Sequence, residues 1–227
     1  MKKVISIGHR GATGHAPENT LTSFKKALEL GADMIELDVH VCKSGEIIVM
    51  HDEKVNRTTN GKGHISKKSL KELKNLTIKK IEKIPTLIEV LNLVNRKCKI
   101  NIELKGKGTE KPVSKIIKKY IQKGWSYNDF LVSSFYPSKI TEIKNINPKI
   151  RIGILVEKIS LEIIALAKKF KVYSINPNIK SISKKFVKKA HQKRLKIFVY
   201  TVNKPGKIKK MKELGVDGII SDFPDRI

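Results

Sequence analysis

Glu36, Asp38 and His51 fall in one short segment, 34–52, with the sequence MIELDVHVCKSGEIIVMHD. Glu36 and Asp38 alternate with apolar residues, the pattern of a half-buried β-strand, so their side chains lie on one face about 6.5–7 Å apart. Two carboxylates at this spacing can bind one hard cation, whose oxygen ligands lie about 2.0–2.6 Å from the ion. The alternative is the solvent-exposed face of an ordinary hairpin.

A tight turn follows this strand and brings His51 back toward the carboxylates. Ser44 and Gly45 stand at the centre of the turn, where Gly adopts a positive φ at little cost, and an apolar strand over 47–51 follows. A turn centred there places His51 across from Asp38, within one residue. The hairpin therefore predicts that two carboxylates and one imidazole converge on one spot.

The rest of the chain alternates predicted strands with predicted helices. Strand-like segments occupy 4–8, 34–41, 47–51, 99–104, 130–134, 151–156, 172–175, 196–201 and 218–221. This alternation favours a parallel sheet with helical crossovers. If 47–51 is the return arm of a hairpin, eight strands remain at about 28 residues per unit, which fits an α/β fold of the (β/α)8 TIM-barrel type. An open doubly wound sheet is the alternative, but no strand is followed by the G-x-G-x-x-G spacing of a dinucleotide site.

Polar or charged residues cluster where the predicted strands end. They are His9, Arg10, Glu36, Asp38, Glu103, Lys105, Ser134, Asn203 and Asp222. The carboxyl ends of barrel strands share one rim, and the active sites of barrel enzymes are built there. We therefore expect an active site on this rim. Beside it we expect a β-hairpin after the second strand and a small insertion between His51 and Glu103, at about residues 52–80.

Length and composition are those of one globular domain spanning residues 1–227. The chain has 227 residues, of which 40% are hydrophobic and 30% charged. No apolar run approaches the roughly 18 residues needed to cross a bilayer, and the first apolar segment is too short for a signal peptide. We therefore expect a cytoplasmic protein. Cys42 and Cys98 lack the spacing of a metal motif or a disulfide framework, so we expect two reduced thiols.

The chain is strongly basic, with 48 Lys and Arg residues against 21 Asp and Glu and a formal net charge of +27. Most of the basic residues are Lys, and Lys pairs recur along the whole chain in segments predicted to be helical. Aromatic residues make up only 6%, and no nucleic-acid motif is present, so we expect no nucleic-acid binding. Compositional bias toward Lys is the favoured explanation, and weak attraction to an anionic membrane surface is the alternative.

Motifs along the chain resemble those of the glycerophosphodiester phosphodiesterase family. The matching motifs occur in the family's order and span nearly the whole chain: His9-Arg10-Gly11, Pro17-Glu18-Asn19-Thr20, Glu36-Leu37-Asp38-Val39, His51-Asp52, Arg57-Thr58-Thr59, Ile84-Pro85-Thr86-Leu87, Glu103-Leu104-Lys105, Ser134-Phe135 and the closing segment 215–224. One departure is Tyr200, where the family usually has Trp.

The resemblance implies hydrolysis of a glycerophosphodiester, a small-molecule substrate, to glycerol 3-phosphate and an alcohol. It implies one divalent metal ion, calcium or magnesium. Two histidines would act as general acid and base, in either assignment, on water or on the glycerol 2-hydroxyl as nucleophile. The residues it assigns are Glu36, Asp38 and Glu103 to the metal, Arg10 and Lys105 to the substrate phosphate, and His9 and His51 to proton transfer.

Two other functions compete with this one. The first is a sphingomyelinase- or lysophospholipase-type phosphodiesterase on a related barrel, and the second is a non-enzymatic binder of anionic polymers or membranes. The alcohol released and the oligomeric state stay open. We expect Asn19 and Thr20 to cap a helix and Glu18 to lie near the metal site. The other histidines are expected to be structural or solvated: His15, His40, His64 and His191.

Overall fold

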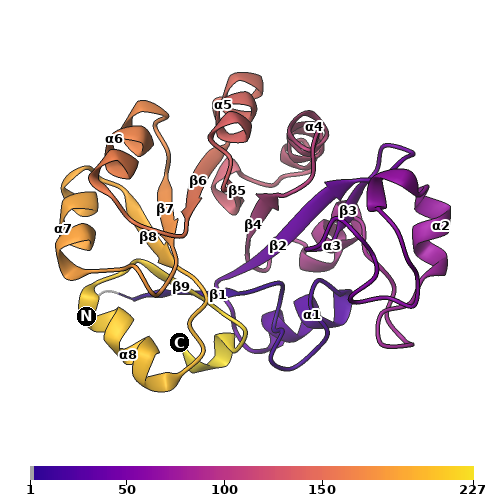
Figure 1. The fold of residues 1–227 in the computed structure, drawn as a ribbon, viewed down its shortest axis with the longest axis horizontal. Coiled ribbons are helices and arrows are strands. Elements are labelled where there is room, and N and C mark those ends of the chain that lie inside the picture. Colours follow the sequence, from indigo (N-terminus) through magenta and orange to yellow (C-terminus); the bar gives the residue numbers. More distant parts are fainter. Residues whose placement is uncertain (1–2) are drawn as a thin grey trace.

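In the computed structural model, which describes residues 3–227, eight parallel strands close into a barrel (Figure 1). The barrel closes because β1 pairs with both β2 and β9. Its strands are β1 (Ile5–Gly8), β2 (Met34–Val41), β4 (Lys99–Leu104), β5 (Phe130–Ser134), β6 (Arg151–Val156), β7 (Ser174–Pro177), β8 (Lys196–Val199) and β9 (Gly218–Ser221). The predicted TIM barrel is confirmed, and the open doubly wound sheet is wrong.

Helices surround the strands, as Figure 1 shows. They are α1 (Leu21–Glu29), α3 (Leu87–Val94), α4 (Glu110–Ile121), α5 (Pro137–Ile146), α6 (Leu161–Lys169), α7 (Lys184–Gln192) and α8 (Pro205–Leu214), with short 3-10 turns η2 (Tyr127–Asp129) and η3 (Pro224–Arg226). Thr20 begins α1 as its N-cap, because its side chain accepts a hydrogen bond from Ser23 N. Gly215 ends α8 in the left-handed conformation that glycine adopts most readily.

Strand β2 is buried on both faces. Ile35, Leu37 and Val39 point outward into the main core between barrel and helices. Glu36 and Asp38 point into the barrel interior and are 4% and 1% exposed. The prediction of a half-buried strand is therefore wrong, because the second face of a barrel strand looks into the barrel and not into solvent. The alternation that separated the two faces was correct.

The predicted hairpin is present, and its register agrees with the expected one to within the one residue allowed. Strand β3 (Ile47–Val49) pairs antiparallel with β2, with Val39 opposite Val49. Met50 N donates a hydrogen bond to Asp38 O at 3.0 Å, so Met50 and not His51 lies across from Asp38. The shift arises because Cys42 N bonds to Glu46 O, which centres the turn on Ser44.

The insertion after β3 has a small hydrophobic core of its own. It contains the 3-10 turn η1 (Ile65–Lys67) and the helix α2 (Leu70–Asn75), which lies at the right of Figure 1, outside the ring of helices. The buried residues of this core come from the hairpin and the insertion: Cys42, Ile48, Met50, Val55, Ile65, Leu73, Ile78 and Ile84. The hairpin therefore joins the insertion to the barrel rim.

No helix within residues 3–227 is long and apolar enough to cross a membrane. Cys42 and Cys98 are both buried free thiols, as expected. Burial raises the pKa of the Cys98 thiol to about 12, so this side chain is an inert part of the core.

Candidate functional site

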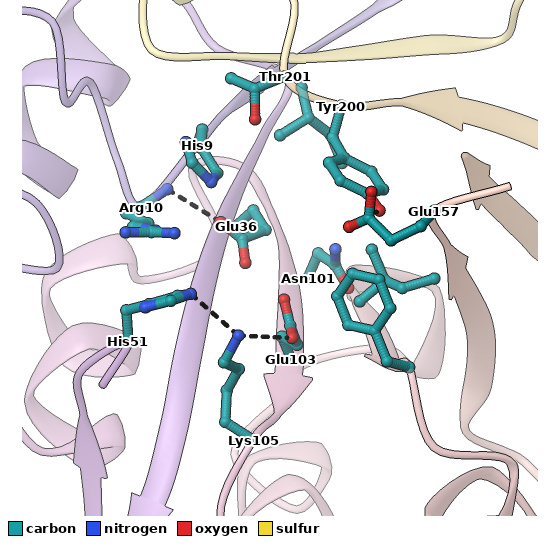
Figure 2. A pocket seen from close by; sticks show the side chains of 13 residues that line it. His9, Arg10, Glu36, His51, Asn101, Glu103, Lys105, Glu157, Tyr200 and Thr201 are labelled. Carbon is teal, nitrogen blue, oxygen red and sulfur yellow. Dashed lines mark hydrogen bonds and ion pairs between the residues drawn. The ribbon is translucent and has the colours of Figure 1, made fainter. Parts of the chain in front are cut away.

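A cavity of about 280 Å³ opens at the carboxyl end of the barrel. Figure 2 shows charged side chains of several strands pointing into it. Its lining includes six of the seven residues selected from the sequence, and the seventh, Asp38, contacts two of them. The lining residues are His9, Arg10, Glu36, His51, Asn101, Glu103, Lys105, Phe135, Leu155, Glu157, Tyr200, Thr201 and Ile220.

Three buried carboxylates meet on one side of this cavity. Glu36, Asp38 and Glu103 each place one oxygen within 4.8 Å of the others. The parallel register sets Asp38 beside Glu103 on the neighbouring strand. Burial, and then the Asp38 charge, raise the pKa of Glu36 well above its usual range and that of Glu103 to about 7. The site therefore concentrates negative charge at a cost that a bound cation would reduce.

Asn101 adds an uncharged oxygen to the same wall of the cavity. It lies on β4, on the same face as Glu103 and beside Glu36 of β2. Its Oδ1 atom is buried and has no hydrogen-bond partner among the described residues. A buried oxygen without a donor is costly, and a cation is one group that would satisfy it. The donor set of carboxylate and amide oxygens suits a hard divalent cation.

Two cationic side chains border the carboxylates. The Arg10 backbone N donates to Glu36 Oε2 at 3.0 Å, and its Nε atom lies 3.4 Å from Asp38 Oδ2. Lys105 Nζ lies 3.2 Å from Glu103 Oε1 and 3.9 Å from Asp38 Oδ1. These positions place a planar guanidinium and an ammonium group at the cavity wall, where an anionic group of a ligand would meet both.

The two histidines are held in the same way. His9 Nδ1 lies 2.6 Å from Asp222 Oδ1, and His51 Nδ1 lies 2.6 Å from Asp52 Oδ1. A carboxylate accepts only, so each Nδ1 carries a proton, and in the neutral form of either ring the lone pair is on Nε2. Lys105 Nζ donates to His51 Nε2 at 3.0 Å, so this ring and the Asp38 carboxylate face one ammonium group. The predicted approach of His51 to Asp38 is confirmed despite the register shift.

The two carboxylates that hold the histidines were not assigned this task from the sequence. Asp222 appeared there only as a polar strand end, and Asp52 only as part of a motif. Asn203 Nδ2 donates to Asp222 Oδ2 at 2.6 Å, and Asn203 Oδ1 accepts from Asp222 N at 2.9 Å. Asn203 was also a polar residue at a strand end. Position on the rim was therefore the sequence signal available for Asp222 and for Asn203.

Asn19 contacts the site and does not cap the helix as expected. Thr20, and not Asn19, caps α1. Asn19 adopts a left-handed backbone with φ 56°, and its Nδ2 atom donates to Asp38 Oδ2 at 3.0 Å. It therefore orients a carboxylate of the site. Glu18 accepts a hydrogen bond from Arg10 Nη1 at 2.8 Å, so it lies beside the site as expected.

The remaining histidines do not line the cavity. His40 Nε2 lies 3.1 Å from His51 O, and His15 Nε2 lies 2.8 Å from Asp225 Oδ1. His191 Nε2 lies 2.8 Å from Asp217 Oδ2, a buried carboxylate. These contacts support the expectation that His15, His40 and His191 are structural.

The chain is similar to known proteins over nearly its whole length. The family model described as "Glycerophosphoryl diester phosphodiesterase family" matches residues 9–226. A glycerophosphodiester phosphodiesterase of Caldanaerobacter subterraneus subsp. tengcongensis is 37% identical, over 99% of this chain and 96% of its own. A glycerophosphodiester phosphodiesterase of Bacillus altitudinis is 38% identical, over 100% of this chain and 96% of its own.

Solved structures give the same result. A phosphodiesterase of Oleispira antarctica, in complex with the product sn-glycerol-3-phosphate, aligns with a TM-score of 0.91 at 28% identity, over 99% of this chain and 95% of that one. A glycerophosphodiester phosphodiesterase of Thermotoga maritima aligns with a TM-score of 0.81 at 30% identity, over 99% and 97% of the two chains. The family match, the relatives and the shared barrel agree: the chain belongs to the glycerophosphoryl diester phosphodiesterase family and is a phosphoric diester hydrolase.

Proposed function

We propose that the protein hydrolyses glycerophosphodiesters to glycerol 3-phosphate and an alcohol, with one divalent cation and with His9 and His51 as general acid and base. The observation that carries this proposal is the convergence of three buried carboxylates, two cationic groups and two carboxylate-held imidazoles at one cavity. The product bound to the Oleispira antarctica phosphodiesterase supports glycerol 3-phosphate as the product here.

Glu36, Asp38 and Glu103 would hold the cation, calcium or magnesium. Their oxygens are close enough to share one ion, and the raised pKa values of Glu36 and Glu103 express the repulsion that an ion would relieve. Three carboxylates suit both metals. When bound, a divalent cation supplies Lewis acidity and polarises a phosphoryl oxygen.

Arg10 and Lys105 would bind the substrate phosphate. The Arg10 side chain lines the cavity and is held on one side by Glu18. Such a planar fork suits two phosphate oxygens, while the Lys105 ammonium acts as a point charge. Because negative charge grows on the phosphoryl oxygens during the reaction, both groups would bind the transition state more strongly than the substrate.

His9 and His51 would move the protons. Their Nδ1 atoms are occupied by Asp222 and Asp52, so each ring would work through Nε2. One imidazole would take a proton from the nucleophile, either water or the substrate's 2-hydroxyl, and the other would give a proton to the departing alkoxide. Burial lowers the pKa of His51, which keeps its ring neutral at neutral pH unless the reaction delivers a proton.

We further propose that the chain works as a single domain, with the insertion at about 52–80 as a small cap beside the cavity, and that it is cytoplasmic. In this proposal the Lys excess reflects compositional bias and does not bind nucleic acid. Weak attraction to an anionic membrane surface is the alternative. Retention on anionic vesicles or DNA that falls steeply as salt rises would contradict the compositional explanation.

The activity is tested with a panel of glycerophosphodiesters. The protein is treated with EDTA, calcium or magnesium is added back separately, and glycerol 3-phosphate is assayed. We expect release of glycerol 3-phosphate that is lost with EDTA and restored by at least one metal. Full activity in EDTA would contradict the metal, and release of a different phosphate ester from every diester would contradict the reaction.

A further inference from the structure

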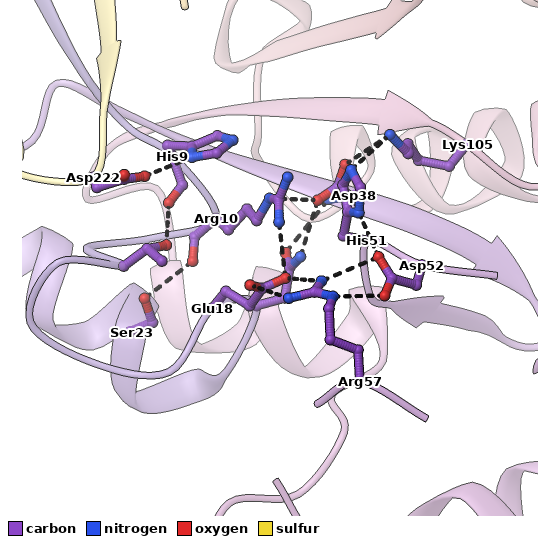
Figure 3. Close-up of polar contacts among 12 residues, drawn as sticks. His9, Arg10, Glu18, Ser23, Asp38, His51, Asp52, Arg57, Lys105 and Asp222 are labelled. Atoms are coloured by element: carbon purple, nitrogen blue, oxygen red, sulfur yellow. Dashed lines mark hydrogen bonds and ion pairs between the residues drawn. The ribbon is translucent and has the colours of Figure 1, made fainter. Parts of the chain in front are cut away.

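Arg57, from the insertion after β3, lies between two carboxylates beside the cavity (Figure 3). Its Nε and Nη2 atoms donate to the two oxygens of Asp52 at 2.6 and 3.1 Å. Its Nη1 and Nη2 atoms donate to the two oxygens of Glu18 at 2.9 and 2.7 Å. One guanidinium therefore makes two bidentate contacts, the strongest geometry available to an Arg–carboxylate pair.

Each of these carboxylates holds a group that lines the cavity. Asp52 Oδ1 accepts from His51 Nδ1 at 2.6 Å, and Glu18 Oε1 accepts from Arg10 Nη1 at 2.8 Å. Arg57 itself does not line the cavity. It therefore reaches a proposed proton-transfer group and a proposed phosphate-binding group through one intermediate residue each.

We propose that Arg57 is a positioning residue for the reaction, which orients His51 through Asp52 and Arg10 through Glu18. The inference rests on the proposed function. The two contacts have different consequences. The Asp52 contact fixes the His51 ring, and ring orientation governs the proton-transfer step. The Glu18 contact divides that carboxylate between two guanidinium groups, which limits its hold on Arg10.

Charge and exposure separate this role from a purely structural one. Burial disfavours the Glu18 carboxylate, but Arg57 and Arg10 outweigh it and lower its pKa to about 2, so the carboxylate stays ionised between them. The Arg57 side chain is 48% exposed and belongs to no hydrophobic cluster. Loss of its guanidinium should therefore disturb the two orienting carboxylates far more than it disturbs the core.

The experiment compares R57A with D52N and E18Q in steady-state kinetics on a glycerophosphodiester. We expect R57A to lower kcat by about 10–100-fold, the range typical of residues that orient a reacting group, and also to raise KM. D52N should lower kcat with little change in KM, because Asp52 contacts His51 directly and reaches Arg10 only through Arg57 and Glu18. E18Q should mainly change KM, because Glu18 contacts Arg10 directly and reaches His51 only through Arg57 and Asp52. Arg57 and Asp52 act on His51 through the same contact, so their effects on kcat should not add. The double variant R57A/D52N should therefore have about the same kcat as the less active of the two single variants.

Two further variants control for charge and for loss of an arginine. R57K keeps the charge but cannot make two bidentate contacts, so its kcat should lie between those of R57A and the wild type. R96A is the matched control, because Arg96 donates to Gly124 O at 3.2 Å and lines no part of the cavity. Thermal unfolding of every variant shows whether the fold is retained.

The proposal is overturned if R57A has kcat and KM within twofold of the wild type, or if its activity falls only in proportion to the unfolded fraction. Failure of the wild type to release glycerol 3-phosphate would instead contradict the proposed function. In that case, NMR of the ring nitrogens still tests Arg57. We expect the His51 nitrogen signals to move in R57A and to stay in place in R96A, and unchanged signals in R57A would overturn the proposal.

Discussion

Asp222 Oδ1 lies 2.6 Å from His9 Nδ1, although the two residues are 213 positions apart in the chain. They meet because β9 pairs with β1 where the barrel closes, with Ser221 opposite Gly8. On the other side of the cavity the equivalent contact joins neighbours in sequence, His51 and Asp52. Two imidazoles are thus held through the same nitrogen by a long-range contact and by a local one.

This relationship predicts the effect of Asp222→Asn. The amide keeps the shape of the carboxylate but no longer favours a proton on His9 Nδ1, so the ring loses its fixed tautomer. We expect kcat to fall by about 10–100-fold with little change in KM. D225N is the matched control, because Asp225 makes the same type of contact to His15, which does not line the cavity. A D222N enzyme with the kcat of D225N would contradict the role of Asp222.

Replacement of the imidazoles themselves should cost more. We expect His9→Ala or His51→Ala to lower kcat by about 10²–10⁴-fold, roughly 3–5.5 kcal/mol of barrier. The fold and metal binding should survive, because the imidazoles are not metal ligands in the proposed site. Activity and metal-induced thermal shifts are measured on the same samples.

The control for these variants follows from the structure. His191 contacts the buried Asp217, so its removal risks a loss of stability that is unrelated to catalysis. H64A is the better control, because the half-exposed His64 lies 3.9 Å from Glu53. If H9A and H51A turn over as fast as H64A, these histidines move no protons in the reaction.

Glu36→Gln tests the metal site. The amide keeps the volume of the side chain but removes one of three negative charges within 4.8 Å. We expect E36Q to need a higher metal concentration for half-maximal activity and to reach a lower kcat. Metal-activation curves measure both quantities, and E213Q, an exposed position on α8, is the matched control. An E36Q curve that coincides with that of E213Q would exclude Glu36 as a ligand.

Stability at acid pH should depend on Glu18. Burial opposes ionisation, but Arg57 and Arg10 lower its pKa from 4.5 to about 2 in the folded state. The unfolded chain binds this proton more tightly, so the stabilisation is complete above about pH 4.5 and is lost as pH falls toward 2. We expect E18Q to be less stable at neutral pH and to show a shallower loss of unfolding free energy between pH 4.5 and 2. Urea titrations at several pH values measure that slope, and an unchanged slope would contradict the coupling.

Local patterns in the sequence predicted the barrel, the hairpin and a rim of polar strand ends, and the family resemblance then selected the seven proposed site residues from them and from the hairpin. Alternation along β2 separates Glu36 and Asp38 from the apolar face, and this depends only on the period of a strand. Polar residues at strand ends identify the rim, because all eight parallel strands end on the same side. The hairpin register could be predicted only to within one residue, because turn type depends on hydrogen bonds such as that of Cys42 N to Glu46 O, which composition does not specify.

Only the tertiary structure decided which side chains form hydrogen bonds to the site residues. Asp222 reaches His9 through barrel closure, and Asn19 reaches Asp38 through a left-handed backbone that places it beside β2. Arg57 joins Glu18 and Asp52 across 39 and 5 positions of sequence. Periodicity reports the direction of a side chain within its own strand or helix. Partners on different elements are set by the pairing and packing of those elements, so these contacts become defined only when the barrel closes.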